Sequence, residues 1–188
     1  SRCGGGPLLF DLGYHKLALA LHLCGPVEAV RAWASRTEIH TGYFLDSPCH
    51  LSWKHQAANR FGSLELAYAP QLFVRSTTYP HVETVEITGT RGILTLSPGC
   101  ARLGDAPPLQ VYREGRSFGF NDLQEDWREA VYASFDSFVA AVLDRTPPML
   151  DAFEALRALR FVLAARESLQ LGGAVAVGDA PRAARTRG

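Results

Sequence analysis

The sequence has no excess of charge of either sign. Its 188 residues include 19 Lys and Arg and 19 Asp and Glu, so the formal net charge at pH 7 is zero with neutral histidines. A neutral chain lacks the positive potential that attracts nucleic acid or an anionic membrane surface. We therefore expect neither a nucleic acid nor a membrane among its partners.

Long apolar runs and clustered cysteines are also missing. The longest apolar run, residues 17–24, contains His22 and is far shorter than the roughly 20 residues that cross a bilayer. No signal peptide is visible, and the start at Ser1 near the first motif indicates a fragment or a trimmed chain. The four cysteines form no Cys-x-x-Cys pair, which disfavours a zinc site and a disulfide framework. We interpret them as reduced thiols of a cytoplasmic protein.

No Gly-x-Gly-x-x-Gly follows a predicted strand, so the dinucleotide fingerprint is absent as well. The glycines that are present lead into an apolar helix, within the stretch 4–25, GGGPLLFDLGYHKLALALHLCG. Asp11 and His15 lie four residues apart and are expected on one helix face. A carboxylate beside an imidazole is a candidate acid/base pair, although an acidic residue in a first helical turn also complements the helix dipole without any catalysis. Gly13 between them would allow a close approach to the backbone.

The rest of the chain reads as strands followed by helices. We predict a strand over 27–38, a turn-rich segment over 41–48, and a hairpin of 49–59 and 62–69 with its turn near 60–62. A second hairpin, 82–88 and 93–96, turns at Gly89–Gly92, and 109–112 is a further short strand. Amphipathic helices are predicted over 123–144 and 151–171, the second capped by Asp151, with an edge strand over 174–177.

Strands in a run followed by helices in a run indicate an α+β fold, here an open, mostly antiparallel sheet with helices packed on one face. We assign residues 1–178 to one domain for substrate and oligomerisation, and 179–188 to a basic disordered tail.

Four landmarks in order resemble the C-terminal domain of the Gfo/Idh/MocA oxidoreductases, the glucose–fructose oxidoreductase and inositol dehydrogenase group. They are GGGPLLFDLGYH at 4–15, LCGPV at 23–27, VEITGTRGILTL at 85–96 and TPPMLDAFEALRALRFVLAARES at 146–168. The resemblance runs from Gly4 to about Val177. It implies NAD(P)-dependent oxidation of a secondary alcohol on a sugar, cyclitol or related polyol, or the reverse reduction.

By the same resemblance, His15 matches the catalytic histidine and Asp11 the acidic residue four positions before it. Family members bind NAD or NADP in an N-terminal Rossmann domain that also carries an EKP-type lysine, and this sequence contains neither. The isolated chain is therefore expected to be inactive and to bind no nucleotide. Ala18 stands where the family often has an acidic residue, which would alter the substrate range.

Further candidate residues have weaker signals. His22 lies seven residues after His15 and Lys54 follows in a predicted strand, so both are candidate substrate contacts, and Gly13 is a candidate point of nicotinamide approach. His22 could equally be a partly buried histidine whose hydrogen bonds are satisfied within the fold. Lys54 with its neighbour His55 could face solvent or an interface. The set His15, His22 and His55 has no metal-ligand spacing, so we predict no metal.

Aromatic residues near the predicted sheet suggest self-association. Trp33, Trp53, Tyr68 and Phe73 are expected on an outer sheet face, which would be unusually apolar for a monomer and would form a homo-oligomer interface. The alternative to an oxidoreductase domain is a non-catalytic assembly or substrate-binding module that lost its cofactor domain.

Overall fold

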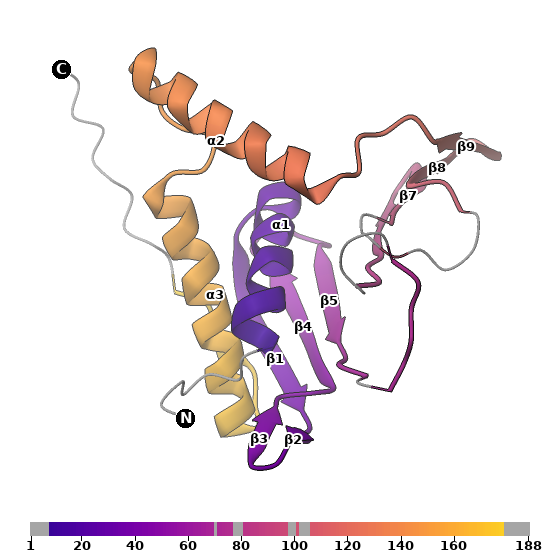
Figure 1. The fold of residues 1–188 in the computed structure, drawn as a ribbon. Helices are drawn as coiled ribbons and strands as arrows, with labels where there is room; N and C mark the ends of the chain where they lie inside the picture. The colour runs from indigo at the N-terminus through magenta and orange to yellow at the C-terminus, as the bar shows by residue number, and fades with distance from the viewer. Residues whose placement is uncertain (1–7, 70, 77–80, 98–100, 102–105, 179–188) are drawn as a thin grey trace. The chain divides into compact units, whose positions relative to one another are not determined.

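The computed structural model describes residues 8–69, 71–76, 81–97, 101 and 106–178 (Figure 1). They fall into two compact units, the first within residues 1–70 and 150–188 and the second within 71–149. Each unit is treated by itself. The single domain over 1–178 stays a prediction, and the tail over 179–188 lies outside the described residues.

The first unit begins with the predicted helix, which has two parts. Leu9–Gly13 is a π-helical segment, η1, and Tyr14–Cys24 is the α-helix α1. The helix ends where the sequence predicts, because Gly25 adopts a φ of 85°, a conformation that glycine reaches without steric cost. The predicted helix is confirmed, and it contains a π-helical segment that the sequence did not indicate.

A four-stranded antiparallel sheet forms the centre of this unit. Its order is β10 (Val175–Ala176), β1 (Val27–Ala34), β4 (Cys49–His55) and β5 (Phe61–Leu66), so the predicted edge strand is confirmed. The predicted strand over 27–38 ends early, at Ala34. A separate two-stranded ribbon of β2 (Thr37–His40) and β3 (Tyr43–Leu45) follows, and β3 lies inside the segment predicted as turns. The β4–β5 turn spans 56–60, ahead of the predicted position.

The helix α3 (Ala152–Leu171) packs on the same side of this sheet as α1, as Figure 1 shows. The Asp151 carboxylate accepts hydrogen bonds from the backbone N–H groups of Phe153 and Glu154, both at 2.9 Å, which confirms the predicted cap. Gly172 ends the helix in the left-handed region. The hydroxyl of Ser168 accepts a hydrogen bond at 2.9 Å from the Ala32 N–H, which ties α3 to β1.

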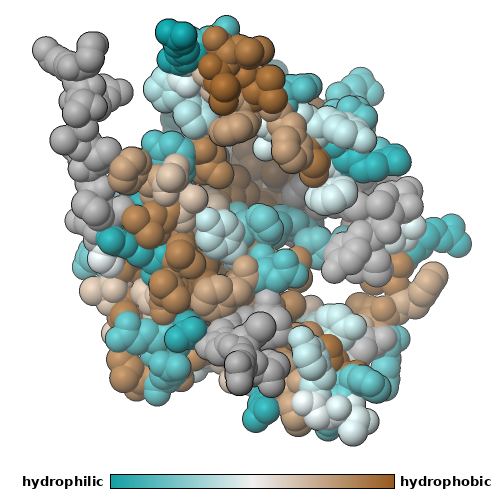
Figure 2. All heavy atoms as spheres, turned by 60° about the vertical axis from the view of Figure 1, so that its left-hand side comes forward, coloured by the Kyte–Doolittle hydropathy of each residue, from teal (hydrophilic) through white to brown (hydrophobic). Residues whose placement is uncertain are grey.

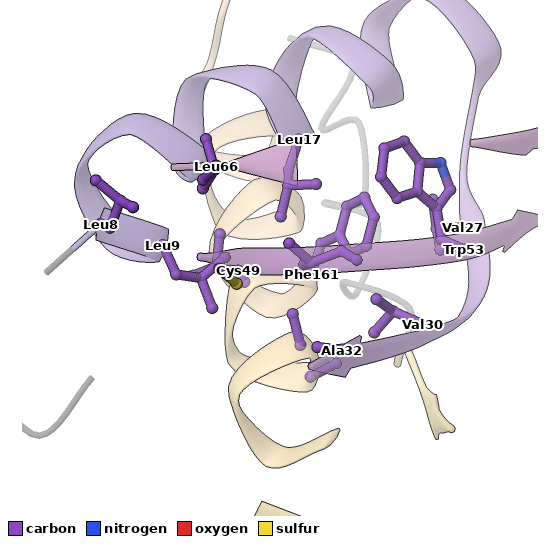
Figure 3. Close-up of a cluster of buried hydrophobic side chains, with 14 residues drawn as sticks. Leu8, Leu9, Leu17, Val27, Val30, Ala32, Cys49, Trp53, Leu66 and Phe161 are labelled. Atoms are coloured by element: carbon purple, nitrogen blue, oxygen red, sulfur yellow. The ribbon is translucent and has the colours of Figure 1, made fainter. Parts of the chain in front are cut away.

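The core of this unit lies between the two helices and the sheet (Figure 3). Leu17 from α1, Leu51 from β4 and Phe161 from α3 are fully buried there. Trp53 also points into the core, where its ring meets Phe161 edge to face at 5.5 Å. The expectation that Trp53 lies on the outer sheet face was therefore wrong, because β4 turns its odd-numbered residues inward.

The second unit holds an antiparallel meander. It consists of β6 (Val85–Gly89), β7 (Gly92–Leu96), β8 (Leu109–Arg113) and β9 (Arg116–Phe120). The hairpin with its turn at Gly89–Gly92 is confirmed, with Val85 paired to Leu96. The strand β9 was missed, because it follows a two-residue turn at Glu114 and Gly115, both at positive φ, and reads Arg-Ser-Phe-Gly-Phe without clear alternation.

The helix α2 (Trp127–Leu143) completes the second unit and confirms most of the predicted helix over 123–144. Asp126 caps it by accepting a hydrogen bond from the Arg128 N–H, and the bonds and charge of Arg128 hold the pKa of Asp126 below its ordinary value. The apolar residues of α2 stay largely exposed. Apolar residues reach the surface at the top of Figure 2, where α2 lies. Among the described residues the strands thus fall into three sheets, and the α+β class with antiparallel pairing is confirmed.

Candidate functional site

The predicted acid/base pair lies on the solvent side of the first helix. Asp11 belongs to η1 and His15 to the first turn of α1, and both side chains are exposed. Within the described residues, no hydrogen bond or ion pair joins them, and His15 contacts the ring of Tyr14 edge to face at 6.0 Å. Both groups are therefore accessible to a ligand. The π-helical turn that carries Asp11 is a rare geometry that occurs frequently at functional sites.

The opposite side of this helix is fixed in the core. Leu9, Gly13 and Leu17 are buried at a spacing of four residues, so the helix separates an inner face from the face of Asp11 and His15. A Cβ at Gly13 would lie 3.0 Å from Leu9 Cδ1 and 3.3 Å from Leu66 Cδ1. The close approach at Gly13 is thus made by Leu9 of the same helix and by Leu66 of β5. Its role toward a nicotinamide stays a prediction.

Three hydrogen bonds anchor the N-terminal half of the helix. The Asp46 carboxylate accepts from the Leu8 N–H through Oδ1 at 3.0 Å and from the Leu9 N–H through Oδ2 at 3.2 Å. The Tyr14 hydroxyl donates to the Ala155 carbonyl of α3 at 3.0 Å. Sequence reasoning missed Asp46 and Tyr14, because their partners lie far away along the chain.

The β4–β5 hairpin anchors the C-terminal end of the helix. His55 Nδ1 lies 2.8 Å from the Gly25 carbonyl oxygen, and the Trp53 indole N–H lies 3.0 Å from His55 Nε2. Because the indole can only donate, Nε2 accepts and Nδ1–H donates, which defines the neutral tautomer. His55 is only 1% exposed, so the suggestion that it faces solvent or an interface was wrong. The Arg60 guanidinium also donates to the Cys24 carbonyl at 3.0 Å.

The other candidate contacts are not all brought together. His22 is exposed on α1, the helix that carries His15. Lys54 lies on the sheet face turned away from the helices, where its ammonium is 2.7 Å from the Glu28 carboxylate. The structure therefore separates Lys54 from the Asp11–His15 pair. The roles of His22 and Lys54 as substrate contacts remain predictions.

The outer face of the four-stranded sheet is mixed in character. Trp33 is 46% exposed there, with the Arg31 guanidinium 4.8 Å from its ring centre and the His50 ring at 5.6 Å. Tyr68 and Phe73 are also exposed, but both lie beyond the end of β5.

No group of three or more His, Cys, Asp or Glu among the described residues is arranged to hold a metal ion. In that part of the chain, no helix is both long enough and apolar enough to span a membrane. Cys24 and Cys49 are free thiols, and burial, with a smaller contribution from Asp46, raises the pKa of Cys49 to about 11.

Fold and site together define an α+β domain that presents an accessible carboxylate and imidazole on an anchored helix. A family model described as the C-terminal alpha/beta domain of an oxidoreductase family matches residues 2–177. The chain belongs to this family, the Gfo/Idh/MocA oxidoreductases, and represents its C-terminal domain. No curated protein matches the chain in sequence.

Solved structures share the fold. An oxidoreductase from Agrobacterium radiobacter, in complex with NAD+, L-tartaric acid and magnesium, is 20% identical with a TM-score of 0.71 over 90% of this chain and 49% of its own. Aldose-aldose oxidoreductase from Caulobacter crescentus, complexed with glycerol, is 18% identical with a TM-score of 0.70 over 91% and 48%. Levoglucosan dehydrogenase with NADH and L-sorbose is 19% identical with a TM-score of 0.67 over 90% and 50%. The chain thus spans about half the length of these proteins.

Proposed function

We propose that this chain is the substrate-binding and catalytic domain of an NAD(P)-dependent oxidoreductase that acts on a secondary alcohol of a sugar, cyclitol or related polyol. The observation that carries the proposal is the accessible Asp11–His15 pair on a helix whose other side is buried. Family membership and similar structures solved with NAD+ or NADH and with polyhydroxy ligands support it.

In this proposal His15 is the general base. One ring nitrogen of His15 takes the proton of the substrate hydroxyl. A bound nicotinamide would supply the hydride acceptor for the carbon that bears this hydroxyl. Asp11, four residues earlier on the same helix, is the proposed acidic partner of His15. In the reverse reduction, His15 returns the proton to the alkoxide oxygen.

The nucleotide would be held by residues outside this sequence. Among the described residues, no strand leads through a glycine-rich turn into a helix N-terminus, the arrangement that binds a pyrophosphate. The described part of the chain does not fit the nucleotide phosphates, and we assign substrate contact and proton handling to it. The residues that would distinguish NAD from NADP are among the same nucleotide contacts outside this sequence.

The proposal is tested on the full-length protein with NAD+ and with NADP+, each against a panel of polyols, cyclitols and aldoses. We expect NADH or NADPH formation with at least one secondary alcohol, and the corresponding ketone as product. Primary alcohols serve as the negative control. Turnover of primary alcohols alone, or of no member of the panel with a folded, nucleotide-binding protein, would contradict the proposal and favour the non-catalytic binding module.

We also propose that the outer face of the four-stranded sheet mediates self-association. Trp33 and Phe61, 46% and 72% exposed, flank the polar residues of β4 on this face, and apolar area of this kind is stabilised by burial. Trp33→Glu is expected to shift the protein to monomer in light scattering. Tyr43→Glu, an exposed aromatic of the β2–β3 ribbon, is the control and should not. A wild-type monomer at high concentration would contradict this proposal.

We propose the cytoplasm as the location, because the free thiols of Cys24 and Cys49 suit a reducing compartment.

A further inference from the structure

The first turn of the site helix has an unusual cap. The N-terminal N–H groups of a helix have no partner within the helix, and a nearby Ser, Thr, Asp or Asn commonly accepts from them. Leu8, at the N-cap position of η1, provides no side-chain hydrogen bond. The carboxylate of Asp46 takes this place, with one oxygen on the Leu8 N–H and the other on the Leu9 N–H, from 38 and 37 residues further along the chain.

Asp46 is itself held firmly. It follows β3 directly, and the next residue, Ser47, is 1% exposed. The Ser47 hydroxyl accepts a hydrogen bond at 2.7 Å from the Tyr68 N–H, and the Ser47 carbonyl accepts one from the Thr37 hydroxyl. The Pro48 carbonyl accepts another, at 2.9 Å, from the Ser35 N–H. The residues that follow Asp46 are therefore held in place by hydrogen bonds.

The cap acts on the turn that carries the acid/base pair. Asp11 follows Leu9 by two residues, and η1 runs from Leu9 to Gly13 without interruption. Burial of Leu9 and Gly13 fixes the inner face of this turn. Two hydrogen bonds to consecutive N–H groups fix its start, and a negative charge near a helix N-terminus adds favourable electrostatics.

We propose that Asp46 is a positioning residue for the Asp11–His15 pair: its two-pronged cap sets the first turn in the geometry that aligns both side chains toward the substrate. This inference rests on the proposed function. Asp46 does not itself contact the reacting atoms. Misplacement of a reacting group by about 1 Å can cost about 100-fold in rate, so loss of the cap should act mainly on turnover.

The test uses Asp46→Ala and Asp46→Asn in the full-length protein, with the substrate found in the panel. Asp46→Ala is expected to lower kcat by about 100-fold and to change KM by less than about threefold. Hydrogen exchange of the segment 8–13 should accelerate at least about tenfold. Asp46→Asn keeps the size and one acceptor oxygen, so it should fold normally and give an intermediate loss of kcat.

Asp151→Ala is the matched control. Asp151 also accepts hydrogen bonds from two consecutive N–H groups, both through Oδ1, but at the start of α3. It should lower the melting temperature as much as Asp46→Ala while leaving kcat within about twofold. A loss of kcat in Asp151→Ala as large as in Asp46→Ala would show that the loss of any helix cap lowers kcat, and this result would overturn the proposal.

A His15→Ala variant distinguishes a failure of the positioning role from a failure of the proposed function. If His15→Ala is inactive and both Asp46 variants keep wild-type kcat despite faster exchange at 8–13, the positioning role is wrong and the proposed function stands. If His15→Ala keeps full activity, the proposed function fails and the positioning role fails with it. Loss of kcat in His15→Ala and in both Asp46 variants supports both.

Discussion

Gly62 gives the sharpest test of how the β4–β5 hairpin is packed. It pairs with Trp53 across the two strands, and the indole ring covers it. A Cβ at Gly62 would lie 2.3 Å from Trp53 Cε2 and Cζ2 and 2.6 Å from Nε1. Because the clash is with a buried ring, Gly62→Ala must displace Trp53.

The cost follows from two contacts. Overpacking of a filled core costs about 1–3 kcal/mol. Displacing the ring also breaks the Trp53–His55 hydrogen bond, and an unpaired buried polar group costs about 1–3 kcal/mol. Replacing a glycine returns about 0.4–1 kcal/mol through the unfolded chain. The middle of these ranges gives a net loss of about 3 kcal/mol, or about 6–12 °C in melting temperature for a chain of this size.

Urea unfolding followed by tryptophan fluorescence and circular dichroism measures this loss. Gly173→Ala is the matched control in the same unit, because a Cβ there meets no atom within 4 Å, and its stability should stay within about 0.5 kcal/mol of wild type. If Gly62→Ala unfolds at the same urea concentration as Gly173→Ala, the close packing of Trp53 on Gly62 is refuted.

Three further predictions concern the thiols and the nucleotide. The raised pKa of Cys49 keeps its thiol protonated, so at pH 8 iodoacetamide should modify Cys24 before Cys49. Peptide mass spectrometry measures both rates, and equal rates would contradict the burial of Cys49. The unfolded chain releases this proton near pH 9 and the folded chain near pH 11, so stability to urea should fall as pH rises through that window, and Cys49→Ala should remove that part of the fall. Calorimetry should detect no micromolar binding of NADH to these 188 residues alone. Such binding would show that these residues do contain a nucleotide site.

Much of the fold was predictable because local signals agree with the tertiary structure. Asp151 and Gly172 mark both ends of α3, and Gly25 ends α1 where expected. The Gly89–Gly92 turn defines its hairpin directly. In each case the residue type is required by the backbone conformation at that position, so the sequence alone carries the information.

The failures have a common physical cause. Trp53 and His55 were considered as surface residues, although a strand sends alternate side chains to opposite faces and both share the inward face with Leu51. Composition could not reveal this, because burial of a histidine depends on partners such as the Gly25 carbonyl that only the fold supplies. The π-helical turn likewise has no sequence signature that separates it from an α-helix.

The candidate site shows the same division. Asp11 and His15 were found from their spacing and from the family resemblance. Asp46 was not, because a cap that comes from 37 residues away has no characteristic spacing. Residues that hold a helix in place are determined by tertiary contacts. A sequence motif therefore identifies Asp11 and His15 but not the residues that anchor their helix.

The most direct test of the central claim is kcat/KM of His15→Ala in the full-length protein. His40→Ala, an exposed histidine of β2, is the control and should match wild type. If His15 is the general base, its loss should lower kcat/KM by about 100-fold or more while the melting temperature stays unchanged. A folded His15→Ala protein with the kcat/KM of His40→Ala would contradict the account.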